Sequence, residues 1–229
     1  MNIQFVFRLF KTSVGRKLLM ASTGLMLAAF MLIHLAENLL MFKGEAAYNG
    51  WVDFLLSNPA TPLMEVGLLG IFLLHIVMGS WVRWEDWANS RGRKYEEINC
   101  QGGRTIGSAT MLYTAIALLA YLSYHILTFR FVDHSAGFYQ MVTSAFRGKV
   151  FVAIYVAGAL ALALHLSHGF ESAFQTLGIN HEKYTPFIKA AGYAVAALMV
   201  IFALISVYYL LGIDLKVHAD SKILETVIN

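Results

Sequence analysis

The chain has 229 residues, of which 58% are hydrophobic and only 14% are charged, and its mean hydropathy is +0.61. Soluble globular domains carry about 25% charged residues, so this composition excludes an ordinary soluble protein and indicates an integral membrane protein. The formal net charge of +3 is small, no nucleic-acid partner is expected, and the single cysteine, Cys100, excludes an internal disulfide and the Cys-x-x-Cys-His motif of covalently attached haem.

Five apolar stretches are each long enough to cross a bilayer, which takes about 20 residues. They cover roughly 18–42, 62–83, 108–131, 149–172 and 187–212. Little chain remains for a soluble domain, so we expect one membrane domain over residues 1–229, folded as an all-α bundle of five transmembrane helices. The first stretch is too long for the core of a cleavable signal peptide. The sequence shows no low-complexity tract and no clear internal repeat.

The connections between the stretches are polar to different degrees. The segment from Lys43 to Pro62 holds Tyr48, Trp51 and Asp53 and is interpreted as an interfacial loop, because Trp and Tyr favour the headgroup level. The most polar segment lies between the second and third stretches, at 83–104. If the N-terminus lies inside, 11 of the 17 Lys and Arg residues fall on the inner side and six on the outer side. The positive-inside rule therefore predicts a cytoplasmic N-terminus and an outer C-terminus.

Each of the first four stretches has a histidine about two-thirds of the way along it, namely His34, His75, His125 and His165. Polar residues inside a bilayer are costly and are functional candidates by default. With the predicted orientation, His34 and His125 lie nearer the outer face, and His75 and His165 nearer the inner face. A rise of 1.5 Å per residue separates the two levels by about 10 Å. The pattern predicts two facing pairs of imidazoles at two depths.

Two facing imidazoles can clamp one haem iron from both sides, and such bis-histidine haem suits electron transfer. A zinc site is less well supported, because zinc takes three or four protein ligands around one point. Three glycines lie near the histidine faces, where small residues would let a porphyrin approach or would simply allow close helix packing. These are Gly79, Gly158 and Gly169.

His168 competes with His165 as the fourth ligand, and we favour His165 because it lies deeper in its stretch and matches the depth of His75. His168 would then contact a haem propionate or lie near the surface. Haem propionates need cations or hydroxyl groups. At the inner end these are Ser22, Thr23 and Arg83, and at the outer end Arg130, although interfacial anchoring is an equally good reading of the arginines.

The chain resembles the dihaem cytochrome b membrane subunit of succinate dehydrogenase and fumarate reductase, in its single-anchor, five-helix form. The resemblance covers nearly the whole chain. It is carried by Ser22-Thr23-Gly24 ahead of His34, by Leu73-Leu74-His75, by His125 near the end of the third stretch, and by the stretch 165–178, His-Leu-Ser-His-Gly-Phe-Glu-Ser-Ala-Phe-Gln-Thr-Leu-Gly. The resemblance implies two stacked b haems, the outer held by the first and third helices and the inner by the second and fourth.

The resemblance further implies a complex in the bacterial cytoplasmic membrane, serving the respiratory chain and the tricarboxylic acid cycle. A flavoprotein subunit would carry the dicarboxylate chemistry, an iron–sulfur subunit would connect it to this chain, and a quinone, usually menaquinone, would exchange electrons with the haems. The polar segment 83–104 and the N-terminus are the expected docking surfaces for these subunits. The remaining contacts are with membrane lipid, and the resemblance also allows a higher oligomer of the complex.

The quinone site needs a group that carries protons, and the resemblance implies a carboxylate near the outer haem. The candidates are Glu65, Glu45, Asp53 and Glu37, of which Glu65 is closest to an apolar stretch. Partial burial there would let Glu65 hold a proton at neutral pH, whereas its other reading is a solvated carboxylate at a helix start.

Two other functions remain open. One is the dihaem subunit of another quinol-linked enzyme, such as a nitrate reductase, a hydrogenase or a formate dehydrogenase. The other is a transporter or scaffold without redox function.

Overall fold

The computed structural model describes residues 10–90, 106–179 and 181–212. Every regular element within these ranges is a helix. In chain order they are α2 (Ser13–Asn38), the short 3-10 helix η1 (Leu39–Lys43), α3 (Glu45–Ser57), α4 (Thr61–Ser90), α5 (Ile106–Phe129), α6 (Phe138–Ala145), α7 (Lys149–Thr176) and α8 (Thr185–Leu210). Most of the polar segment 83–104, including Cys100, lies outside the described residues.

Five helices are long and apolar enough to cross a membrane, which confirms the predicted all-α architecture with five spans. They cover Ser13–Lys43, Thr61–Asn89, Ile106–Phe129, Lys149–Thr176 and Thr185–Leu210. The second runs six residues past its predicted end at 83, because charged residues end an apolar stretch without ending a helix. With up to 31 residues, these helices exceed the length needed to cross a bilayer and can cross it at a tilt.

The helix ends follow from local sequence. Thr12 caps α2, since its side-chain oxygen accepts a hydrogen bond from the backbone N–H of Gly15 at 3.1 Å. Gly178 ends α7 with a φ of +79°, and the N–H of Ile179 donates to the carbonyl of Phe174 at 3.0 Å. This is a Schellman motif, in which glycine accepts the left-handed conformation at little cost. The Thr-Leu-Gly178 end of the resemblance stretch is thus a helix terminus.

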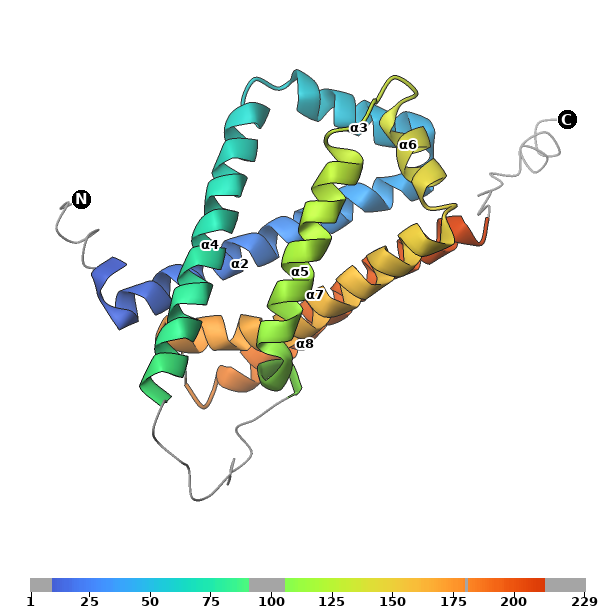
Figure 1. Ribbon diagram of the computed structural model, residues 1–229. Helices are drawn as coiled ribbons and strands as arrows, with labels where there is room; N and C mark the ends of the chain where they lie inside the picture. The colour runs from blue at the N-terminus through green and yellow to red at the C-terminus, as the bar shows by residue number, and fades with distance from the viewer. Residues whose placement is uncertain (1–9, 91–105, 180, 213–229) are drawn as a thin grey trace, which may run out of the picture.

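The connection from Lys43 to Pro62 is not the loop that the sequence suggested. Residues Glu45–Ser57 form helix α3, which has no buried residue and spans the distance between the end of α2 and the start of α4 (Figure 1). It packs near α6, where the side-chain oxygen of Asn49 accepts a hydrogen bond from the N–H of Tyr139 at 2.9 Å. Polar and aromatic residues misled the interpretation, because a helix lying along a membrane interface carries both kinds.

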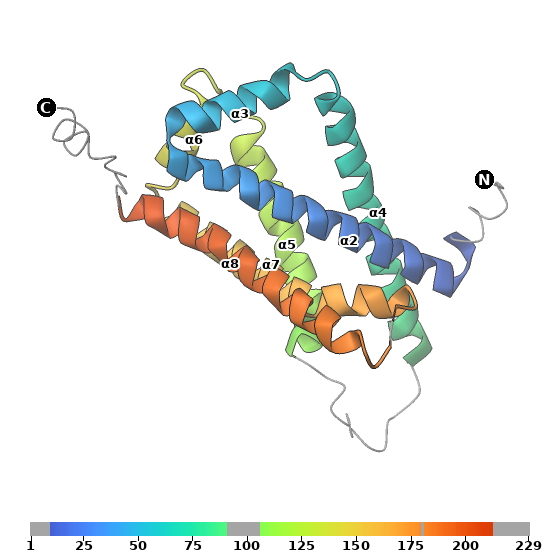
Figure 2. The ribbon, with the colours of Figure 1, turned by 180° about the vertical axis from the view of Figure 1, so that it is seen from behind.

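The five long helices form two groups: α4 and α5 cross over α2, α7 and α8. In Figure 1, α4 and α5 run in front of α2, while Figure 2 shows α2 and α8 in front when the molecule is seen from behind. Helix α7 lies between α5 and α8. The main buried apolar cluster joins α2, α7 and α8, and consists of Ala28, Leu35, Leu166, Ala196, Met199 and Ile205. Helices α4 and α5 lie across this three-helix layer.

Candidate functional site

The four histidines lie on four different helices, α2, α4, α5 and α7, and each is half-buried. The structure brings His34 and His125 together, with ring centroids 6.0 Å apart and ring planes at 83°. His165 of α7 lies near His75 of α4. The helices therefore supply two histidine pairs, His34–His125 and His75–His165.

The imidazole of His75 is held by helix α2. Its Nδ1 lies 3.1 Å from the backbone carbonyl of Met20 and 3.2 Å from Thr23 Oγ1. A carbonyl only accepts, so Nδ1 carries the proton and donates it. A Cβ added at Gly24 would come within 3.0 Å of His75 Cε1, so the glycine gives the imidazole room against the α2 backbone.

His165 is held in the same way by helix α5. Its Nδ1 lies 3.3 Å from Thr114 Oγ1, and the hydroxyl of Thr114 donates to the carbonyls of Thr110 and Met111 at 3.1 and 3.0 Å. With its own proton directed at the backbone, Thr114 is left to accept from His165. Thr114 is 5% exposed, so this hydrogen bond is shielded from competing water.

His125 is held by helix α7 through a tyrosine. Its Nδ1 lies 3.0 Å from the hydroxyl of Tyr155, which lies 3.3 Å from Thr128 Oγ1. Thr128 in turn donates to the carbonyl of Tyr124 at 2.8 Å. If His125 Nδ1–H donates to the Tyr155 hydroxyl, and that hydroxyl donates to Thr128, each polar hydrogen of these three side chains has an acceptor.

His34 has weaker polar contacts and an aromatic surrounding. Its Nδ1 is 3.7 Å from a carboxylate oxygen of Glu37, and its Nε2 is 3.5 Å from the amide nitrogen of Asn38. The rings of Phe30 and Phe202 lie 5.6 and 5.7 Å away. Glu37 also acts on Tyr48 of α3: burial, and secondarily the charge of Glu37, raise the pKa of Tyr48 to about 12. The Tyr48 hydroxyl therefore stays protonated.

The hydrogen bonds leave the same atom available on three of the four histidines. Among the described residues, Nε2 of His75, His125 and His165 has no hydrogen-bond partner, whereas Nδ1 is engaged in each. An Nδ1–H that donates fixes the tautomer in which Nε2 carries a free lone pair, as in most metal-ligating histidines.

Within the described ranges, no three His, Cys, Asp or Glu side chains converge on one point. A four-ligand zinc site made by protein side chains alone is therefore not supported there. The His75–His165 pair, with both Nε2 atoms free among the described residues, suits a metal whose remaining ligands come from elsewhere.

The two helix pairs carry a repeat that the sequence analysis missed. In α2, Met20 precedes Thr23 by three residues and His34 follows Thr23 by eleven, and Met111, Thr114 and His125 have the same spacing in α5. In the partner helices, His75 is followed by Gly79 and His165 by Gly169, each after four residues.

The contacts show that this repeat is structural. Thr23 contacts His75 and Thr114 contacts His165, at 3.2 and 3.3 Å. Met20 faces Gly79 and Met111 faces Gly169, with their side-chain ends 3.7 and 3.9 Å from the position of a Cβ. The α2–α4 and α5–α7 helix pairs are thus two equivalent antiparallel units. Each unit supplies one histidine to the His34–His125 pair and one to the His75–His165 pair. Gly79 and Gly169 face methionines in ordinary contact.

The residues predicted to contact haem propionates lie in different surroundings. Ser22 and Arg83 are exposed, and the Thr23 hydroxyl is engaged with His75 and with the α2 backbone, donating to the carbonyl of Leu19 at 2.7 Å. His168 is half-buried beside Gly107 and lies near His165, one turn earlier on α7. Gly158 does not open toward a ligand, because a Cβ there would overlap the ring of Tyr121.

Two residues predicted separately are joined. Arg130, just after α5, donates to Glu65 near the start of α4 at 3.2 Å, and their side chains are 59% and 49% exposed. The partial burial expected for Glu65 is therefore not observed. Among the other carboxylates, Asp53 is exposed and Glu45 accepts from Gln140 at 3.4 Å, whereas the side chain of Glu37 is only 23% exposed.

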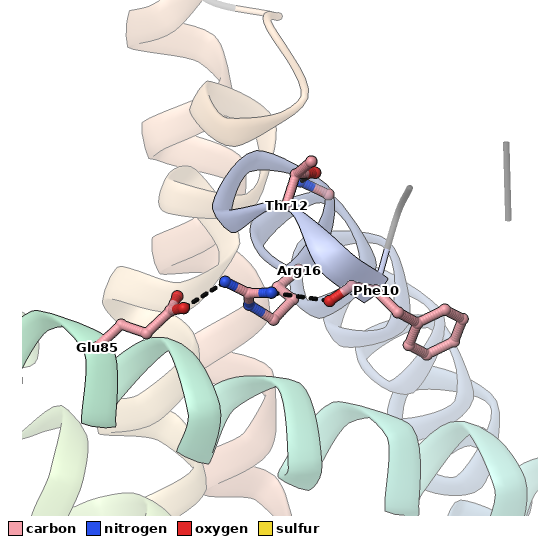
Figure 3. Close-up of polar contacts among 5 residues, drawn as sticks. Phe10, Thr12, Arg16 and Glu85 are labelled. Carbon is pink, nitrogen blue, oxygen red and sulfur yellow. Dashed lines mark hydrogen bonds and ion pairs between the residues drawn. The ribbon is translucent and has the colours of Figure 1, made fainter. Parts of the chain in front are cut away.

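A buried ion pair near the start of α2 was also missed. Arg16, which is 6% exposed, is paired with Glu85 of α4 and donates to the carbonyl of Phe10 at 2.8 Å (Figure 3). Its guanidinium lies 5.1 Å from the ring of Trp81. This contact fixes the register of α2 on α4, two turns before Thr23.

Compared with protein-family models, with curated proteins and with solved structures, the chain gives no match. Function is therefore inferred from the residues of the chain itself.

Proposed function

We propose that the chain is the membrane cytochrome b subunit of a succinate:quinone oxidoreductase, that is, of a succinate dehydrogenase or fumarate reductase. His34 and His125 would be the axial ligands of one b haem, and His75 and His165 those of a second. Two haems held in this way supply one-electron transfer between an iron–sulfur subunit and a membrane quinone such as menaquinone.

The observation that carries the proposal is the state of the histidine rings. Three of them direct Nδ1 at a protein acceptor and leave Nε2 without a partner among the described residues. An Nε2 atom without a partner inside apolar helices is costly in free energy. Metal binding by Nε2 would remove this cost, and the Nδ1 hydrogen bonds hold the tautomer that metal binding needs.

Among the described residues, no third His, Cys, Asp or Glu side chain joins either pair, and this favours haem over a bare metal ion. A porphyrin supplies four nitrogen ligands and leaves two axial positions, the number that each histidine pair offers. The haem at the His34–His125 pair would connect α2 to α5, and the haem at the His75–His165 pair would connect α4 to α7. Both haems would therefore join the two helix pairs. We expect the cofactors to stabilise the bundle for this reason.

The succinate or fumarate part of the proposal rests on the sequence resemblance. The four proposed ligands come from the first four spans in chain order, as that family implies, and the sequence contains no flavin or iron–sulfur motif. A flavoprotein and an iron–sulfur subunit would dock on the cytoplasmic side, at the end of the bundle that carries Arg16 and Glu85. The His75–His165 pair lies nearer that end.

The test is a haem assay of the purified protein, with histidine variants. We expect a b-type visible spectrum, and two haems per chain that acid acetone extracts. His75→Ala or His165→Ala should each remove the same haem, and His34→Ala or His125→Ala the other, while His181→Ala, outside the five helices, should retain both. A protein without haem would overturn the proposal.

The partner subunits decide between the related enzyme classes. Purification in a mild detergent should bring down a flavoprotein and an iron–sulfur protein, and the complex should oxidise succinate or reduce fumarate. A partner that carries molybdenum or nickel would instead assign the chain to a nitrate reductase, formate dehydrogenase or hydrogenase.

A further inference from the structure

Tyr155 is the one side chain on α7 that reaches across to the imidazole of His125. Its hydroxyl lies 3.0 Å from His125 Nδ1, and the residue is only 7% exposed. The ring is enclosed by other aromatic rings, including Phe151 stacked at 4.6 Å and Phe146 at 5.3 Å. A phenol held so tightly has little freedom to leave its partner.

The backbone of α7 is shaped to allow this contact. Gly158 lies one turn after Tyr155, and the ring of Tyr121 occupies the space that a Cβ at Gly158 would fill. Tyr121 and His125 lie one turn apart on α5, so the close approach at Gly158 also brings His125 toward α7. The rings of Tyr121 and Tyr155 meet edge to face, with centroids 5.3 Å apart.

The equivalent position in the other helix pair has no such contact. Glu65 precedes His75 by ten residues, as Tyr155 precedes His165, but the Glu65 carboxylate is paired with Arg130. His34 accordingly has no hydrogen bond from α4 within the described residues, and its nearest Nδ1 contact is Glu37 at 3.7 Å. Tyr155 therefore breaks the symmetry of the repeat at the His34–His125 pair.

We propose that Tyr155 is the positioning residue for His125 and that its hydrogen bond lowers the reduction potential of the haem bound between His34 and His125. An Nδ1–H that donates makes Nε2 a stronger electron donor, and this favours the oxidised iron. The proposal rests on the proposed function, because it needs a haem at that pair.

The experiment is a redox titration of the complex carrying Tyr155→Phe, with optical and electron paramagnetic resonance detection. We expect both haems to remain, the potential of one to rise, the potential of the other to stay unchanged, and the low-spin ferric signal of the affected haem to shift. Thr128→Val should move the same potential in the same direction by less, because it removes only the acceptor for the Tyr155 proton.

Tyr124→Phe is the matched control. Tyr124 neighbours Tyr155, with ring centroids 6.4 Å apart, and its hydroxyl makes no hydrogen bond within the described residues. This variant should leave both potentials and both signals unchanged. Unchanged potentials in Tyr155→Phe, or an equal change in both haems, would overturn the role of Tyr155, whereas a wild-type complex without haem would overturn the proposed function instead.

If Tyr155→Phe loses haem altogether, Thr128→Val decides the outcome, because it changes the hydrogen bonds of the Tyr155 hydroxyl and leaves the Tyr155 ring in place. A raised potential of one haem in Thr128→Val supports positioning by hydrogen bond. An unchanged potential in Thr128→Val assigns Tyr155 to packing alone and overturns the proposal.

Discussion

The imidazole of His75 lies directly against the backbone of Gly24, where an added Cβ would come within 3.0 Å of Cε1. Few real Cβ contacts are that short, so a side chain at Gly24 must displace the ring or separate α2 from α4. Either movement breaks the hydrogen bond from His75 Nδ1 to the carbonyl of Met20.

We therefore predict that Gly24→Val lowers the haem content from two to one per chain, with loss of the haem bound by His75 and His165. Gly70→Val on α4 is the matched control, because nothing lies within 4 Å of a Cβ at Gly70. A pyridine haemochrome assay measures both variants. Two haems in Gly24→Val would show that His75 tolerates the displacement.

The second prediction compares the two equivalent threonines. Thr114 is the one hydrogen-bond partner of His165 Nδ1 among the described residues, whereas His75 keeps the carbonyl of Met20 when Thr23 is changed. Thr114→Val should therefore loosen haem binding more than Thr23→Val, although both changes conserve shape. Haem release during an acid titration, followed optically, should begin at a higher pH in Thr114→Val. Equal release would indicate that the threonine hydroxyls do not orient the ligands.

The five spans and the four histidines could be predicted from sequence because apolar length and intramembrane polarity are properties of single segments. The partners of the histidines could not, since Thr114 and Tyr155 become partners only through the rotation and register of α5 on α7. The Met-x-x-Thr and His-x-x-x-Gly spacings do contain this information. They are weak signals individually, and their meaning depends on knowing which helices are paired.

The expectations for Gly158 and Glu65 differ from the structure for the same reason, which is that contacts between helices decide their surroundings. Gly158 was interpreted through its distance along the chain from His165, but the ring of Tyr121 on a neighbouring helix occupies its open side. Glu65 was expected to be partly buried because it begins an apolar stretch. The divergence of α4 from α2 at that end leaves it exposed and paired with Arg130.

The third prediction concerns the buried pair between α2 and α4. Arg16 is 6% exposed, so Glu85→Gln would leave a buried guanidinium without its counter-charge, a change that costs about 3 kcal/mol or less given that Glu85 is partly exposed. We expect a lower midpoint of thermal unfolding in detergent. The double variant Arg16→Met with Glu85→Gln should regain much of the loss, because it removes the unpaired charge. No recovery would show that the pair matters for more than its charge balance.

The fourth prediction tests Glu65 and Glu37 as proton carriers for a quinone. Glu65 remains our first choice because it lies at the start of α4 on the expected outer side. Glu37 competes because its side chain is less exposed than that of Glu65 and lies 3.7 Å from His34 Nδ1. Quinone reactions take up or release two protons with two electrons, so loss of the carrier should slow quinone-linked turnover without affecting the dicarboxylate site.

We expect Glu65→Gln to keep both haems and to slow turnover between dicarboxylate and quinone, while electron transfer from dicarboxylate to a soluble dye stays at the wild-type rate. Arg130→Gln is the companion variant, because it breaks the same ion pair and leaves the carboxylate in place. Slow quinone turnover in Glu65→Gln alone assigns the effect to proton transfer by Glu65. Equal slowing in both variants assigns it to the ion pair that joins α4 to the end of α5. Unchanged turnover in Glu65→Gln, with slow turnover in Glu37→Gln, would move the proton carrier to α2, beside His34.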